Sequence, residues 1–192
     1  MRSTTLLSLT SVLLLAACSA NGTSISAENK NPLVAAQYGD ELADTMANLI
    51  IQNDPIVQDA AMKEVIDAEI ARGKGISEEA RMLHSKGLGG ALIPINQEVE
   101  GLLLFTDGKL HFHSTFFTDP GPNLHVFMTE AVDPRDVSFP DKTAVDLGEI
   151  QSAYGAQTYA VKAKNASALR TVVLWDLTLN RLYSFAQLAK GL

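Results

Sequence analysis

The sequence predicts an α+β protein, in which N-terminal amphipathic helices precede a mainly antiparallel β-sandwich or barrel. Apolar residues recur every three or four positions over residues 33–86, which is the period of a helix with one buried face. From Gly87 onward the period changes to two, the period of a strand. The strand-like segments that follow are short and are separated by turn signals rather than by helices. Such a series is typical of an antiparallel sandwich or barrel.

The first 17 residues have the layout of a bacterial lipoprotein signal peptide. Arg2 supplies a positive start, and the apolar stretch up to Ala17 is shorter than the roughly 20 residues that a membrane-spanning helix needs. Leu15-Ala16-Ala17-Cys18 resembles a lipobox, in which the chain is cut before the cysteine and the thiol then receives lipid. We predict that Cys18 is lipidated, with acyl chains such as palmitate as the membrane anchor. The alternative is an ordinary secretory signal with an unrelated cysteine nearby.

This anchor predicts an extracytoplasmic location in a bacterial cell envelope. Ser19, and not an aspartate, follows Cys18, which favours the periplasmic face of the outer membrane in a host with two membranes. Cys18 is the only cysteine, so no internal disulfide is expected. Loss of Arg2 with the signal would take the formal charge from −7 to −8, and so acidic a body argues against nucleic acid as a partner.

Residues 18–32 are predicted to form a flexible tether. They are rich in Ser, Asn, Gly, Thr and Ala, and they carry no periodic apolar pattern.

The helical segment, residues 33–86, divides at Asp54-Pro55, where Asp54 is a candidate helix cap and Pro55 occupies a tolerated first position. Gly73 and Gly75 are expected to end the second helix, and a short third helix is expected to open at residues 77–80. Amphipathic helices need a partner surface. That surface is either the other helices and the following domain, or another envelope protein that docks on residues 33–86.

The β region covers residues 87–192. Its clearest hairpin turns at Asp107-Gly108, and Asp119-Pro120-Gly121-Pro122 forces another turn because prolines and a glycine interrupt a strand ladder. The predicted strands are residues 99–106, 109–118, 124–131, 145–150, 158–163, 169–178 and 182–188. Residues 183–188 fit a terminal helical turn equally well.

An ordered set of motifs in this region resembles the DM-thirteen domain, the "electron transfer" module of bacterial lipoproteins and animal extracellular proteins. The motifs are Gly121-Pro122-Asn123-Leu124, Val145-Asp146-Leu147-Gly148, Gly155-Ala156-Gln157-Thr158-Tyr159 and Val172-Val173-Leu174-Trp175. The resemblance covers roughly residues 95–190. It implies an extracytoplasmic β domain, similar in style to cytochrome-like and haem-binding sandwich modules, with a proposed redox role.

One position departs from the family pattern. The resemblance implies a cysteine directly after the tryptophan position, as the basis of the redox proposal, and this chain has Asp176 there. A carboxylate cannot cycle between thiol, sulfenic acid and disulfide. Asp176 is therefore a candidate functional position whose family chemistry is lost.

Histidines offer an alternative redox site. His111 and His113 alternate with apolar neighbours and are expected to share one face of their strand, and His125 on a neighbouring strand is expected to lie on that face. These three side chains are candidate metal ligands, and a histidine with Met128 could clamp haem. The other interpretation is that the histidines line a solvated sheet face.

No catalytic motif stands out, so we do not predict an enzyme. The leading hypothesis is a lipid-anchored binding or interaction module of the envelope that carries no cofactor. The alternative is a redox domain that binds haem or a metal ion through its histidines.

Overall fold

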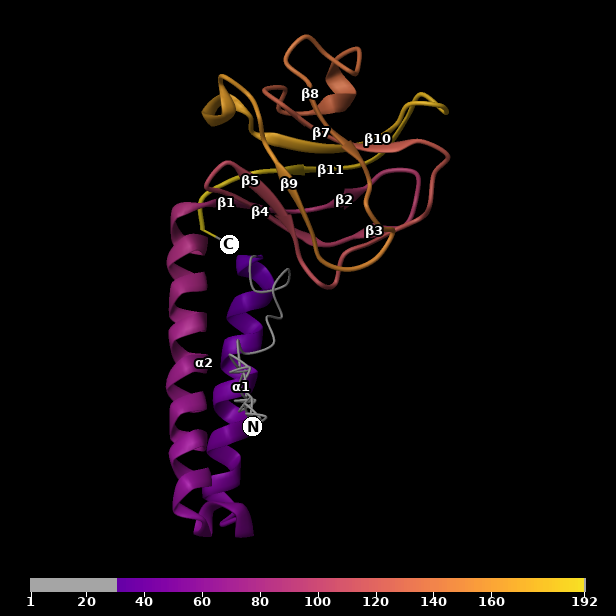
Figure 1. Cartoon of the computed structure of the whole chain (residues 1–192). Helices are drawn as coiled ribbons and strands as arrows, with labels where there is room; N and C mark the ends of the chain where they lie inside the picture. The colour runs from indigo at the N-terminus through magenta and orange to yellow at the C-terminus, as the bar shows by residue number, and fades with distance from the viewer. Residues whose placement is uncertain (1–30, 192) are drawn as a thin grey trace, which may run out of the picture.

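The computed structural model describes residues 31–191, so the predicted signal, Cys18 and most of the predicted tether lie outside the described residues. Two long helices pack side by side and project from one end of a β-sandwich (Figure 1). Helix α1 spans Pro32–Ile51, the short 3₁₀ helix η2 spans Pro55–Gln58, and α2 spans Ala60–Lys86. We call these three elements the arm. Neither long helix combines the length and apolar character that a membrane crossing would need.

Each helix of the arm begins at a side-chain cap. The side chain of Asn31 accepts a hydrogen bond from the backbone of Leu33, while Asp54 caps η2 and Asp59 caps α2. Asp54 and Pro55 thus have the roles that the sequence predicts. Asn31 and Pro32 are buried at the start of α1, so the chain is already ordered two residues before the predicted tether ends.

The predicted end of the second helix is wrong, because α2 runs without a break through Gly73, Gly75 and Ser77. A Cβ atom at Gly73 would stand 2.6 Å from the carbonyl oxygen of Gly39 on α1, and a Cβ at Gly39 would stand 2.5 Å from that of Gly73. Both glycines therefore let the two backbones touch. Gly75 has open space around it and simply continues the helix.

The β region is an antiparallel sandwich and not a closed barrel. One sheet has the order β1-β4-β5-β9, with β1 at Leu88–Ala91, β4 at Leu102–Thr106, β5 at Lys109–Phe112 and β9 at Gln157–Ala160. We call it the arm-side sheet. The second has the order β2-β11-β10-β7-β8, with β2 at Ile93–Pro94, β11 at Arg181–Gln187, β10 at Thr171–Asp176, β7 at Leu124–Thr129 and β8 at Val145–Glu149. We call it the outer sheet. A two-stranded ribbon pairs β3 (Val99–Glu100) with β6 (Phe117–Thr118), and two 3₁₀ turns occupy Pro134–Asp136 and Ala166–Ala168.

Most of the strands predicted from the sequence are present in the structure, but they begin and end at different residues. Asp107 and Gly108 both adopt positive φ in the tight turn between β4 and β5, as a two-residue hairpin requires. Gly101 at φ +146° separates β3 from β4, which the sequence suggests as one strand. The last segment is strand β11 and not a helical turn. The short strands β1 and β2 have no counterpart among the predicted ones.

The main core fills the space between the two sheets. Large side chains with almost no exposed surface form it, among them Leu103, Leu110, Phe112, Val126, Met128 and Leu174. A second apolar cluster covers the far face of the outer sheet, where Phe127, Val173 and Phe185 pack under Phe139 from the loop that follows β7. Strands β7 and β10 are therefore buried on both faces, which explains why they read as nearly continuous apolar runs.

The base of the arm packs on the outward face of the arm-side sheet. The Nδ2 group of Asn31 donates a hydrogen bond to the backbone oxygen of Phe112 (2.7 Å), and the hydroxyl of Thr106 donates one to the backbone oxygen of Leu83 (3.3 Å). Both helices of the arm are thus tied to the sandwich at one end, while their other ends are free (Figure 1).

Candidate functional site

Asp176 is fully buried at the end of β10, and backbone donors surround its carboxylate. Oδ1 accepts hydrogen bonds from the backbone N–H groups of Thr178 (2.9 Å) and Leu179 (2.8 Å). Oδ2 accepts one from the backbone N–H of Asn123 (3.1 Å). The first two bonds hold the turn between β10 and β11, and the third holds the loop before β7. Asp176 therefore connects two loops.

Gly121 and Tyr183 complete the surroundings of this carboxylate. A Cβ atom at position 121 would overlap Oδ2 of Asp176 and would stand 2.7 Å from the hydroxyl oxygen of Tyr183, so a larger residue there would displace the carboxylate or the phenol. Burial raises the pKa of the Tyr183 phenol, and the charge of Asp176 raises it further. The site is a buried carboxylate beside a neutral phenol. Neither of these two groups is an electron acceptor.

The structure does not bring the three predicted histidines together. Leu110 and Phe112 point into the core, so His111 between them lies on the outward face of the arm-side sheet, under the arm. Val126 points into the same core from β7, so His125 lies on the outward face of the other sheet. The core separates His125 from His111. The expectation that His125 shares the face of His111 is wrong, because the packing of two sheets is not visible in a local strand pattern.

Each predicted histidine has its own polar partner. The Nδ1 atom of His111 lies 3.0 Å from the hydroxyl of Thr158, and that of His113 lies 2.8 Å from the hydroxyl of Thr115. His113 follows the end of β5 and is not part of the strand. His125 is 3.0 Å from the carboxylate of Asp146 on β8.

Within residues 31–191, no three His, Cys, Asp or Glu side chains are grouped so that they could hold a metal ion. Met128 has no exposed surface and points into the core, on the opposite face of β7 from His125. This geometry does not fit a haem clamp by His125 and Met128. The donor sets that the sequence suggests for a metal or haem are therefore not assembled in the described part of the chain.

A fourth histidine, which the sequence analysis does not single out, lies at the junction of the arm and the sandwich. His84 is in the last turn of α2, and its Nε2 atom is buried without a hydrogen-bond partner. Burial lowers the pKa of His84, and it lowers the pKa of His111 to about 4. The charge of Arg81 lowers the pKa of His84 further and that of Lys109 lowers the pKa of His111, while Asp107 raises the pKa of His111 in part, so burial is the main reason that the junction favours neutral imidazoles.

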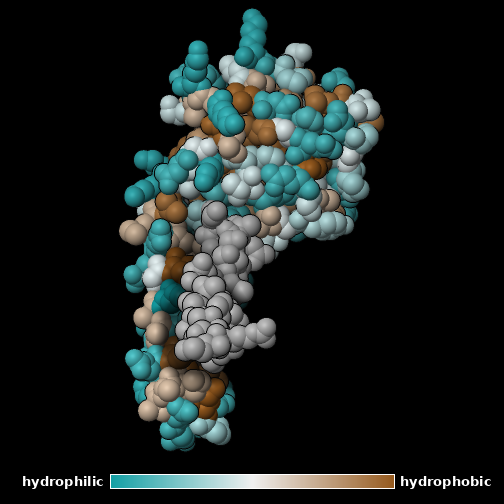
Figure 2. Space-filling view, in the orientation of Figure 1, coloured by the Kyte–Doolittle hydropathy of each residue, from teal (hydrophilic) through white to brown (hydrophobic). Residues whose placement is uncertain are grey.

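The free end of the arm, which we call the tip, presents apolar side chains to solvent. Ile51 at the end of α1 is 78% exposed and Val65 on α2 is 52% exposed. Ile50, Ile56 and Met62 are also exposed. Apolar residues are visible at this end of the arm in Figure 2. Large apolar side chains gathered at a surface mark an interaction site more often than scattered ones do.

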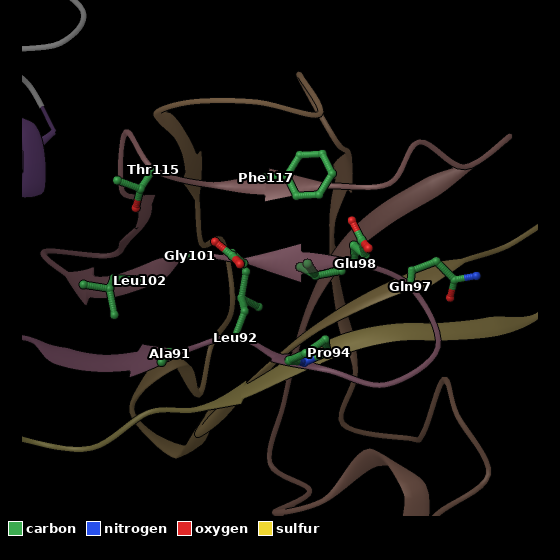
Figure 3. A pocket seen from close by; sticks show the side chains of 11 residues that line it. Ala91, Leu92, Pro94, Gln97, Glu98, Gly101, Leu102, Thr115 and Phe117 are labelled. Carbon is green, nitrogen blue, oxygen red and sulfur yellow. The ribbon is translucent and has the colours of Figure 1, made fainter.

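A cleft of about 720 Å³ lies between the β1–β2 segment and the β3–β6 ribbon. Leu92 and Pro94 lie along one side and Phe117 along the other, with Gln97 and Glu98 toward one end (Figure 3). No expected site residue lines this cleft. The sequence signal for it was weak, because Gln97-Glu98-Val99-Glu100 reads as the ordinary polar entry to a strand.

A comparison with known families confirms the resemblance that the sequence of the β region shows. Residues 96–188 match the model of a family described as "Electron transfer DM13", which is the DM-thirteen domain. The match covers the ribbon, both sheets apart from β1 and β2, and Asp176. The arm lies outside it. Neither the curated proteins nor the solved structures contain a significant match to the chain.

Proposed function

We propose that this protein is a lipid-anchored binding module of a bacterial envelope, in which the arm that precedes the DM13 domain of residues 96–188 docks another envelope protein. The lipobox-like sequence at Cys18 supports the anchor and, with it, the proposed location outside the cytoplasm. The periplasmic face of the outer membrane is the location that Ser19 favours in a host with two membranes.

The exposed apolar tip carries the docking proposal. Along its length the arm buries its own contact face, where small residues such as Gly39, Ala43, Gly73 and Ala80 meet. The tip has no such partner among the described residues, although Ile51 and Val65 would each gain from burial. Asp54 and Asp59 flank these side chains, so the proposed partner surface is apolar with a polar or basic rim.

Site-specific photo-crosslinking in the native host tests the docking. A photoreactive residue at position 51 or 65 should give one defined protein adduct. The same residue at Met82, which is 56% exposed but lies near the base of the arm, is the matched control and should not. Absence of an adduct at the tip positions, or an equal adduct at position 82, would contradict the proposal. The anchor is tested separately by Cys18→Ser, which should release the protein from the membrane fraction.

Electron transfer is the second candidate, because the description of the matched family favours it. Among residues 31–191 the fit to a redox group is poor, since position 176 is a carboxylate held by backbone donors and no three His, Cys, Asp or Glu side chains are grouped to hold a metal ion. An absorbance spectrum and metal analysis of protein purified from its native host decide the matter. A Soret band or a stoichiometric metal that disappears in a His111→Ala/His113→Ala double variant would establish this candidate.

A further inference from the structure

We propose that the cleft beside the β3–β6 ribbon binds a small organic cation, an ammonium group carried on an apolar body. This site is distinct from the tip of the arm, and the inference does not depend on the docking proposal. The charge, the aromatic wall and the apolar floor of the cleft each point to this class of ligand.

The charge of the cleft is wholly negative. Glu98 and Glu100 are the charged residues that line it, and no Lys, Arg or His is among its lining residues. Both glutamates are exposed, and the carboxylate of Asp119 lies behind Glu98, where it accepts a hydrogen bond from the Glu98 backbone. A cleft lined by charges of one sign concentrates ligands of the opposite sign and repels anions.

An aromatic residue is the cross-strand partner of one of these glutamates. Glu100 on β3 pairs directly with Phe117 on β6, and cross-strand partners project from the same face of a ribbon. Their strand neighbours, Val99 and Thr118, are buried on the other face. Phe117 also packs against Tyr154, with ring centroids 5.4 Å apart, which fixes its position. Carboxylates and an aromatic ring that line one cleft attract an organic ammonium both by charge and by the cation–π interaction.

The remainder of the lining suits an apolar body. Leu92, Pro94 and Leu102 contribute carbon surface, and the volume of about 720 Å³ is within the range of small-molecule sites.

Backbone hydrogen bonds hold the cleft walls in place before any ligand enters. The N–H of Leu92 donates to the carbonyl of Gly101 (2.9 Å), which joins the two sides. The N–H of Glu98 donates to Oδ2 of Asp119 (3.0 Å), and the N–H of Asp119 donates to the carbonyl of Glu98 (2.9 Å). A site that is already formed loses little conformational freedom on binding.

Three probes with one body and different head groups test the charge preference. Phenethylammonium, neutral phenylpropanol and anionic hydrocinnamate are titrated into the mature lipidated protein in a non-ionic detergent, and binding is followed by calorimetry and ligand-observed NMR. Phenethylammonium should bind saturably, at least about tenfold more tightly than phenylpropanol, and more weakly as salt is added. Hydrocinnamate should not bind.

Variants assign the binding to the cleft. Glu98→Gln/Glu100→Gln should weaken phenethylammonium binding about tenfold, and Phe117→Leu should reduce its preference over phenylpropanol. The matched control, Glu64→Gln/Glu149→Gln, removes two exposed charges elsewhere and should leave binding unchanged. Circular dichroism of each variant verifies that it folds. Equal binding of the neutral probe, unchanged binding in the cleft double variant, or equal loss in the control would overturn the inference, while leaving the docking proposal untouched.

Discussion

The arm and the sandwich are held together by opposite kinds of packing. Along the contact between α1 and α2 the buried residues are mostly small, and the backbones meet at Gly39 and Gly73. Between the sheets the buried residues are large, and Phe112 touches the rings of Phe116 and Tyr159. An added side chain at the helix contact should therefore destabilise the arm, whereas removal of a large side chain from the core should destabilise the sandwich. Trp175, the only tryptophan, lies in the outer sheet and packs on Phe139 of the loop after β7. Its fluorescence therefore reports on the folding of the sandwich alone.

The largest expected effect is a cavity in the sandwich. Phe112→Ala removes a fully buried ring, and we expect it to lower the free energy of unfolding by about 4 kcal/mol. Urea unfolding followed by Trp175 fluorescence measures this loss. Phe112→Leu keeps most of the volume and is the control, since it should cost clearly less. Equal losses for both variants would show that the ring is not closely packed.

Adding a side chain at the helix contact should damage the arm instead. Gly73→Leu forces its side chain into the backbone of α1 and should cost the arm about 3 kcal/mol or more. The helical signal in circular dichroism should then be lost at lower urea, while the Trp175 transition stays in place. Gly75→Ala, two residues away in open space, should stabilise α2 by about 0.5–1 kcal/mol. If both substitutions had the same sign, the contact between the two glycines would not exist.

The junction between the two regions should respond to acid. His111 has its pKa lowered from 6.5 to about 4 by burial, so the folded protein binds this proton less readily than the unfolded chain does. The contribution of neutral His111 to the free energy of unfolding is fully present above about pH 6.5. It is lost as the pH falls toward about 4, and the loss reaches up to about 3 kcal/mol. The lowered pKa of His84 likewise makes the folded protein less stable as the pH falls.

Urea unfolding at several pH values within this window measures the slope. His111→Gln can keep a hydrogen bond to Thr158 but does not titrate, so its stability should depend less on pH. An unchanged slope in that variant would assign the acid sensitivity to other groups.

The smallest expected effect concerns Asp176. In Asp176→Asn an amide replaces one carboxylate oxygen, so one of the three backbone donors that it satisfies loses its acceptor, at a cost of about 2 kcal/mol. Thermal unfolding followed by Trp175 fluorescence detects the change. Asp54→Asn, at an exposed cap where the two residues serve equally well, should be neutral. A neutral Asp176→Asn would mean that the carboxylate does not hold the loops.

Local patterns predicted the parts of this fold that local forces determine. The helical period located the arm, and Asp107-Gly108 located a hairpin. Gly73 was misread because a glycine that ends a helix and a glycine that admits a neighbouring helix look alike until the partner is known. His125 was misplaced for the same reason, since the face of a strand acquires its meaning only when two sheets pack.

The hydrogen bond from Asn31 to the backbone of Phe112 has a mechanical consequence. It fastens the chain to the sandwich before the arm begins, and the arm returns to the same sheet at Leu83 and Thr106. A pull on the segment that precedes Asn31 is therefore transmitted to the sandwich directly at Phe112. The arm is a side branch outside this path of tension, so a load applied at Asn31 does not pull its two helices apart.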